Sequence, residues 1–251
     1  MFLNKLSAQQ GDEYIRLADN YKKNSKADSA LVFYKKASLE FQDLQSVEKL
    51  MIAYNQIGVI YTKKDEYDSS ALYLKRALAK QPFLSDTNNL TFATTYISLG
   101  VMYGAQDNIE RSLFYHNKAL AIRILKLGEN SADVATSYGN IGNVYLRTQD
   151  YDRSLDAHLK AMAIRKKLYG KTSAEIAQSY ICLANLYREK KDYKSSIEYF
   201  DKALENKITQ LGLGHKELAK YYKNLSDVYY LKSDKKNGDL YKNKAEGVQK
   251  N

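Results

Sequence analysis

A period of 42 residues runs through almost the whole chain and constrains its fold more than any other feature. Three series of residues keep one register, with a small residue three positions before each tyrosine and an alanine 16 positions after it. The small residues are Ala18, Gly58, Gly100, Gly142, Ala184 and Ser226; the tyrosines are Tyr21, Tyr61, Tyr103, Tyr145, Tyr187 and Tyr229; the alanines are Ala37, Ala77, Ala119, Ala161, Ala203 and Ala245. We therefore predict six consecutive repeats, approximately residues 11–50, 51–92, 93–134, 135–176, 177–218 and 219–251.

Each repeat carries two blocks of apolar residues at helical spacing. In the fourth repeat, Ile141, Val144 and Tyr145 form the first block, and a second block runs from Leu155 to Ile164. A polar break with helix-start chemistry separates the two blocks, and a single proline among 251 residues also favours helices over a β-sandwich. We predict a helical hairpin in each repeat, called here helix A and helix B. The caps of helix B are assigned to Asp65, Asp107, Asp150, Asp192 and Asp234, and the ends of helix B to Gly128, Gly170 and Gly212.

The small residue, tyrosine and alanine in this order resemble the tetratricopeptide signature, as in Leu99-Gly100-x-x-Tyr103 with Ala119. The longer period, with "LGENSADVATSYGNIGNVY" (127–145) and "YGKTSAEIAQSYICLANLY" (169–187), resembles the 42-residue repeats of kinesin light chains. The usual proline that closes each repeat is missing, and the first repeat is shorter. The resemblance implies an all-α fold, a right-handed α-solenoid of about six stacked hairpins that forms one domain over residues 1–251.

The small position of helix A has a structural explanation in this fold. A glycine inside a helix costs about 1 kcal/mol relative to alanine. At Gly142 that cost is offset if helix B of the same repeat crosses closely there, since the missing Cβ lets the backbones approach. The small, tyrosine and alanine series are thus expected to be structural.

Residues that could support catalysis are scarce. Cys182 is the only cysteine, which excludes a disulfide framework and a cysteine-based zinc site, and we interpret it as an inert buried thiol. His116 and His158 occupy equivalent positions of helix B, which favours packing over a metal pair. No glycine-rich phosphate loop is present. We therefore predict no enzyme activity, no metal and no cofactor.

Charge and hydropathy limit the class of partner. The chain carries 39 basic and 29 acidic residues, a net charge of +10, which indicates either a solvated lysine-rich surface or attraction to acidic partners. No apolar run reaches the length of a membrane span, and the single cysteine is consistent with a cytoplasmic protein. The lysines are spread without an aromatic stacking platform, so nucleic acid is not the expected partner.

The resemblance also implies a concave groove lined by helix A. Carried over to this chain, the groove contains a ladder of Asn143, Asn185 and Asp227, spaced 42 residues apart, and an amide column of this kind can hydrogen-bond to an extended peptide. The alternative is that these asparagines are ordinary solvated positions. The candidate peptide-binding residues are Asn140, Asn143, Arg147, Gln178, Asn185, Arg188, Lys220, Lys223, Asn224 and Asp227.

The earlier repeats lack this polar face. Val59, Ile97 and Val101 form an apolar patch at equivalent positions, which suits a peptide with hydrophobic and acidic ends. We predict a non-enzymatic scaffold that binds a protein or peptide partner. The alternative is the sensor portion of a larger signalling protein, such as a kinase, a regulator or a caspase-like peptidase.

Overall fold

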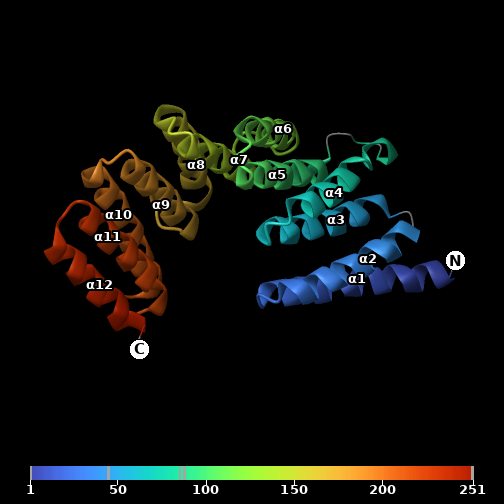
Figure 1. Cartoon of the computed structure of the whole chain (residues 1–251), viewed down its shortest axis with the longest axis horizontal. Coiled ribbons are helices and arrows are strands. Elements are labelled where there is room, and N and C mark those ends of the chain that lie inside the picture. The colour runs from blue at the N-terminus through green and yellow to red at the C-terminus, as the bar shows by residue number, and fades with distance from the viewer. Residues whose placement is uncertain (1, 44–45, 85, 87–88, 250–251) are drawn as a thin grey trace. The chain divides into compact units, whose positions relative to one another are not determined.

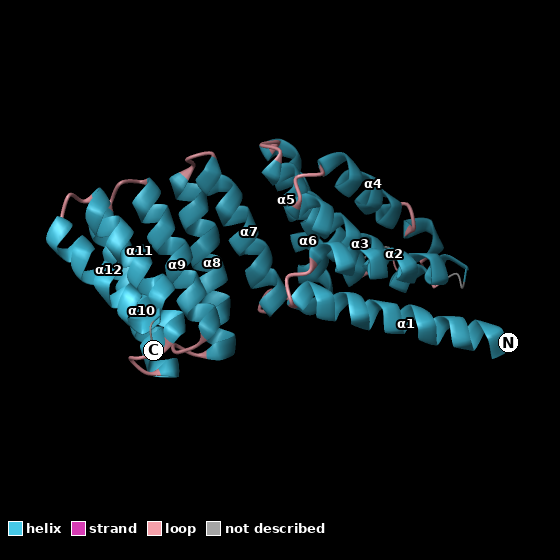
Figure 2. Ribbon diagram, turned by 60° about the horizontal axis from the view of Figure 1, so that its bottom comes forward, coloured by secondary structure: helices cyan, strands magenta, loops and turns pink. Residues whose placement is uncertain are grey.

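The computed structural model describes every residue except 1, 44–45, 85, 87–88 and 250–251. The described part of the chain contains twelve α-helices, two short 3-10 helices and no strand (Figures 1 and 2). The chain divides into two compact units, residues 1–126 and 127–251, called here the N-terminal and the C-terminal unit. A single continuous solenoid over both units stays a prediction.

Consecutive helices pair into hairpins in both units, as the two blocks of each repeat predict. The helices of the N-terminal unit are α1 (Phe2–Lys23), α2 (Ala27–Asp43), α3 (Val47–Lys63), α4 (Tyr67–Leu78), α5 (Leu90–Ala105) and α6 (Ile109–Leu127), with the 3-10 helix η1 (Gln81–Phe83). Those of the C-terminal unit are α7 (Ala132–Arg147), α8 (Tyr151–Tyr169), α9 (Ala174–Glu189), α10 (Tyr193–Leu211), α11 (Ala219–Leu231) and α12 (Lys235–Gln249), with η2 (Lys216–Leu218). The prediction of an all-α fold is confirmed.

The turn inside each hairpin corrects two of the expected caps. The last residue of helix A is followed by a turn whose non-glycine residue adopts a positive φ, +60° at Asp65 and +57° at Asp107. Helix B begins after the next residue, which has returned to negative φ: Glu66 precedes α4 without a side-chain cap bond, whereas Asn108 caps α6 with its side chain. Asn108, rather than Asp107, thus accepts from the backbone N–H of Arg111 at 3.1 Å. Asp150, Asp192 and Asp234 are caps as predicted, and Gly128, Gly170 and Gly212 follow helix B with positive φ.

The small residue of helix A lies where helix B crosses it, as expected. A Cβ added at Gly142 would lie 2.8–2.9 Å from the imidazole ring of His158, closer than van der Waals contact allows. Gly100 faces His116 in the same way, and Gly58 faces Leu74 at 2.6 Å. Each pair is 16 residues apart, so the repeat register places a large side chain of helix B over the missing side chain of helix A.

In four of the hairpins, a buried serine of helix B forms a hydrogen bond to the backbone of helix A at the same crossing. The hydroxyl of Ser154 in helix B donates to the carbonyl oxygen of Gly142 at 2.9 Å, and it is fully buried. Equivalent bonds join Ser70 to Gly58, Ser112 to Gly100 and Ser196 to Ala184. In the last repeat the two residue types are exchanged, and Ser226 in helix A donates to the carbonyl of Gly238 in helix B at 2.8 Å.

Replacing Ser154 by alanine is expected to lower the free energy of unfolding by about 1 kcal/mol, because one net hydrogen bond is lost while the helix bonds remain. Urea denaturation measures this change. The matched control is Thr209→Ala on α10, whose exposed hydroxyl donates to the carbonyl of Glu205 within its own helix. Equal losses in the two variants would contradict the role given to the buried serine.

Stacked aromatic rings complete the hairpins. The repeat tyrosine of helix A stacks on an aromatic ring 12 residues later, for example Tyr103 on Tyr115 with ring centroids 5.5 Å apart. The fourth repeat has Ala157 at that position, and the Arg153 guanidinium instead lies 4.7 Å from the centre of the Tyr145 ring. The hairpin contact is thus kept by a cation–π interaction.

Candidate peptide-binding face of the C-terminal unit

The ten candidate residues all lie in the C-terminal unit, on the three helices A of that unit. Serine side chains fix where two of these helices begin: Ser131 accepts from the N–H of Val134 at the start of α7, and Ser173 accepts from the N–H of Ile176 at the start of α9. Helix α9 packs against both α7 and α8, and α11 packs against α10 (Figure 2). The repeat register therefore places equivalent residues of α7, α9 and α11 on the corresponding face of each helix.

The predicted ladder occupies equivalent positions of the three helices. Asn143 on α7 and Asp227 on α11 are exposed, and Asn185 on α9 is partly exposed. Asn140 and Asn224, one turn earlier on α7 and α11, are also partly exposed. Within the described residues, none of these five side chains makes a hydrogen bond to another protein group. Their donors and acceptors are therefore open to solvent or to a ligand.

The basic candidates differ in their surroundings. Arg147 is exposed at the end of α7. The Arg188 guanidinium lies 3.3 Å from a carboxylate oxygen of Glu189, its neighbour in sequence, so its charge is partly balanced. The Lys220 ammonium lies 5.2 Å from the centre of the Tyr221 ring.

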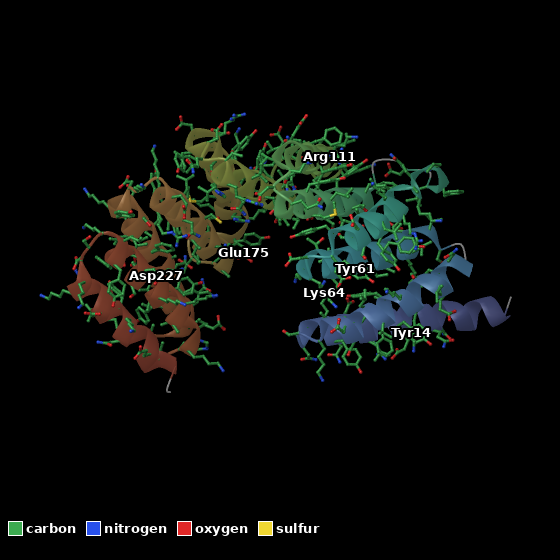
Figure 3. All side chains as sticks on the ribbon, in the orientation of Figure 1. Tyr14, Tyr61, Lys64, Arg111, Glu175 and Asp227 are labelled. Atoms are coloured by element: carbon green, nitrogen blue, oxygen red, sulfur yellow. The ribbon has the colours of Figure 1, made fainter. Side chains whose placement is uncertain are left out.

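A cleft of about 650 Å³ lies between α11 and α12 and contains three of the candidates. Lys220, Lys223 and Asp227 line it from α11 (Figure 3 labels Asp227). Its other wall contains Lys242 and Glu246 from helix α12, which were not among the predicted residues. The resemblance implied a groove lined by helix A, and in the last hairpin helix B also lines the cleft.

A second cleft, of about 270 Å³, lies between α7 and α9 near the starts of both helices. The predicted residue Gln178 lines it, together with Glu175 and Arg165 (Figure 3 labels Glu175). Arg165 comes from α8 and was not among the predicted residues. A signal was present in the sequence, since Arg123 occupies the equivalent position one repeat earlier.

Cys182 lies beside this cleft on α9. Its thiol is partly buried, and the amide nitrogen of Gln178 lies 3.7 Å from its Sγ atom. Burial raises the pKa of the Cys182 thiol, although Gln178 and Arg165 act in the opposite direction. The raised pKa favours the protonated thiol near neutral pH. The predicted burial is only partial, and the inertness of the thiol stays a prediction.

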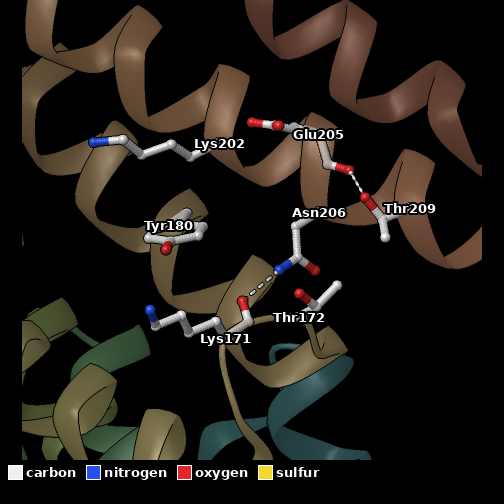
Figure 4. Close-up of a pocket in the computed structure, with 7 residues that line it drawn as sticks. All are labelled: Lys171, Thr172, Tyr180, Lys202, Glu205, Asn206 and Thr209. Carbon is white, nitrogen blue, oxygen red and sulfur yellow. Dashed lines mark hydrogen bonds between the residues drawn. The ribbon is translucent and has the colours of Figure 1, made fainter.

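A third cleft lies where the loop after α8 passes α10 (Figure 4). Its central residue, Asn206, is buried, and its amide donates to the carbonyl oxygen of Lys171 at 3.0 Å. The amide of Gln210 in turn donates to the Asn206 side-chain oxygen at 2.6 Å. The hydrogen bond of Asn206 is made to the loop after α8, so Asn206 attaches the connection between the fourth and fifth repeats to α10.

The two helix B histidines are core residues. His116 and His158 are each 2% exposed and pack on the glycines opposite them. Burial and, to a smaller extent, the nearby charges of Arg123 and Arg165 lower the pKa of the two side chains to about 4. In the described part of the chain, no group of three or more metal-ligating side chains comes together.

The apolar patch expected in the earlier repeats lies in the N-terminal unit. Val101 on α5 is 49% exposed, while Val59 and Ile97 are partly buried. Throughout the described residues, no helix is both long enough and apolar enough to span a membrane.

Comparisons with known proteins agree with the repeat pattern. Models of the tetratricopeptide repeat match residues 53–84, 91–167 and 175–237. No curated protein matches the sequence significantly. Among solved structures, BtubC (BKLC) from P. vanneervenii is 18% identical with a TM-score of 0.71, and the match covers 97% of this chain and 91% of that one.

Two further structures share the fold. A putative kinesin light chain from Podosopora anserina, with nearly identical TPR-like repeats, is 13% identical with a TM-score of 0.68, covering 81% of this chain and 96% of that one. The STAND protein PH0952 from Pyrococcus horikoshii, which has a tetratricopeptide repeat sensor, is 18% identical with a TM-score of 0.66, covering 94% of this chain and 41% of that one. The matched repeat models span more than half of the sequence, and the chain therefore belongs to the tetratricopeptide repeat family.

Proposed function

We propose that this chain is a non-enzymatic scaffold whose C-terminal unit binds an extended segment of a partner protein. The observation that carries the proposal is the row of Asn143, Asn185 and Asp227, whose side chains are unbonded within the described residues. An extended peptide has a backbone donor and acceptor at each residue, and asparagine offers both a donor and an acceptor in return. The peptide thus runs across α7, α9 and α11.

The charges of this face favour a partner with acidic residues. Arg147, Lys220 and Lys223 stand on the same helices as the amide row, and the chain has a net charge of +10. Opposite charges across an interface raise the association rate and select the partner. Nucleic acid is not the proposed ligand, and the cytoplasm is the proposed compartment.

The experiment selects peptides of twelve residues from a displayed random library on the immobilised full chain. We expect Asn143→Ala combined with Asn185→Ala to weaken binding of the selected peptides by about tenfold, since each amide loses its bonds to the peptide backbone. Isothermal titration calorimetry measures the change. Asn243→Ala, which removes an exposed asparagine from α12, is the matched control and is expected to leave binding unchanged.

An equal affinity of the double variant and the wild type would overturn the groove assignment. The alternative function, a sensor within a larger signalling protein, is favoured by the repeat sensor of the STAND structure. The sensor would use the same face as the scaffold, and it differs from the scaffold in that an effector domain is encoded in the same reading frame. The gene sequence on both sides of this segment distinguishes the two.

A further inference from the structure

Arg165 on α8 is a partly buried arginine whose guanidinium reaches between α7 and α9. Its Nη1 donates to the Ser179 hydroxyl at 3.0 Å. Its Nη2 lies 3.7 Å from the place where a Cβ on Gly139 would stand. Among the described residues, no carboxylate lies within ion-pair distance of this guanidinium. A half-buried cation with most of its donors unused is costly unless another group balances it.

The surroundings of Arg165 form the small cleft between α7 and α9. Thr136 and Gln178 line it at equivalent positions of the two helices, and Tyr169 lines it from the end of α8. Gln178 is one of the candidate peptide-binding residues, and Thr136 occupies the equivalent position on α7. The cleft thus opens beside the path proposed for the peptide backbone.

Glu175 also lines this cleft and limits what can enter. Its carboxylate offsets part of the positive charge of Arg165. A second negative charge on a ligand therefore adds little favourable electrostatic energy in this cleft. A single carboxylate satisfies the planar fork of the guanidinium through two parallel hydrogen bonds. The combination favours a carboxylate over a phosphate.

The next pair of helices lacks the arrangement. Between α9 and α11, the position of Arg165 is taken by Lys207, whose ammonium bonds to Gln210 at 3.3 Å. The position of Gly139 is taken by Ile181, which has a large side chain where glycine has none. The repeat register is shared, and the difference in residue type confines the arginine cleft to the fourth and fifth repeats of this unit.

We propose that the Arg165 cleft is the anchoring subsite for one carboxylate of the bound peptide. This inference rests on the function proposed above. The carboxylate is supplied either by an aspartate or glutamate side chain or by the C-terminus of the peptide. It binds the free edge of the guanidinium, and the amide of Gln178 donates a further hydrogen bond.

The test uses the full chain and the synthetic twelve-residue peptides from the display selection. Arg165→Gln is expected to weaken their binding by about tenfold or more, the loss of a bidentate charged pair. The affinity of Arg165→Lys is expected to lie between those of the wild type and Arg165→Gln, because lysine keeps the positive charge but cannot form two parallel hydrogen bonds. Glu175→Gln is expected to tighten binding, since the opposing carboxylate is removed. Thermal unfolding of each variant checks that the fold is kept.

Changes to the peptide identify the carboxylate. Aspartate-to-asparagine and glutamate-to-glutamine changes test the side chains, and C-terminal amidation tests the terminus. The peptide that lost the anchoring group is expected to bind wild type and Arg165→Gln equally. If Arg165→Gln and Arg165→Lys keep full affinity while Asn143→Ala with Asn185→Ala loses it, the carboxylate subsite is wrong and the groove stands. If no peptide is selected, or neither change lowers affinity, the proposed function itself is wrong.

Discussion

Lowering the pH from 7 to 4 is expected to reduce the free energy of unfolding by about 3 kcal/mol for each of the two buried histidines, His116 and His158. Burial lowers the folded-state pKa of each imidazole from 6.5 to about 4. Between these values the unfolded chain binds a proton that the folded chain does not. The contribution of the two histidines to the free energy of unfolding is therefore fully present above pH 6.5, and it is lost as the pH falls from 6.5 through about 4. Urea denaturation at pH 7, 6, 5 and 4 measures this loss.

The chain itself suggests the control for this experiment. Gly58 faces Leu74 in the second repeat, at the position that the histidines occupy in the third and fourth repeats. The double variant His116→Leu with His158→Leu thus keeps a packing arrangement that the protein already uses. It is expected to lose the acid sensitivity between pH 6.5 and 5, while the capping carboxylates still titrate at lower pH. The same pH dependence in both proteins would show that the histidines are not its cause.

Replacing Gly142 by leucine is expected to lower the free energy of unfolding by about 3 kcal/mol and the melting temperature by on the order of 10 °C. The first added atom would already lie 2.8 Å from the ring of His158. The ring is 2% exposed and packed by both helices of the hairpin, so it has little space into which it can move. Circular dichroism at increasing temperature measures the change.

Gly139, three residues earlier on the same helix, provides the matched control. A Cβ there would lie 3.7 Å from the Arg165 guanidinium, an ordinary van der Waals distance. Alanine is also the better helix former by about 1 kcal/mol. Gly139→Ala is therefore expected to leave the melting temperature unchanged or to raise it. A similar loss in both variants would contradict the explanation by helix crossing, and so would an unchanged melting temperature of Gly142→Leu.

Much of the fold could be predicted from sequence because the same steric requirement recurs in each hairpin. A residue that must be small recurs at each helix crossing, as Gly58, Gly100 and Gly142 show. The capping residues were harder to place. Asp107 and Asn108 are both good caps in sequence, and only the positive φ at Asp107 assigns the role to Asn108.

The candidate face was predicted in part, for the same reason. Equivalent positions such as Asn143 and Asn185 could be found by counting, since the helix register decides which face they share. Counting also finds Arg123 and Arg165 at equivalent positions of helix B, but it cannot show that the Arg165 guanidinium reaches the cleft between α7 and α9. Its access depends on Gly139 in the same repeat and on Ser179 in the next one.

The sequence by itself determined the six repeats, the helical hairpins and the positions that must stay small, because these depend on spacing along one chain. The tertiary structure alone decided what stands opposite each position. It placed His158 against Gly142, Ser154 on the carbonyl of Gly142, and the Arg165 guanidinium in a cleft between two helices. Such pairings depend on how neighbouring helices cross, and a period in the sequence carries no information on the distance between two side chains.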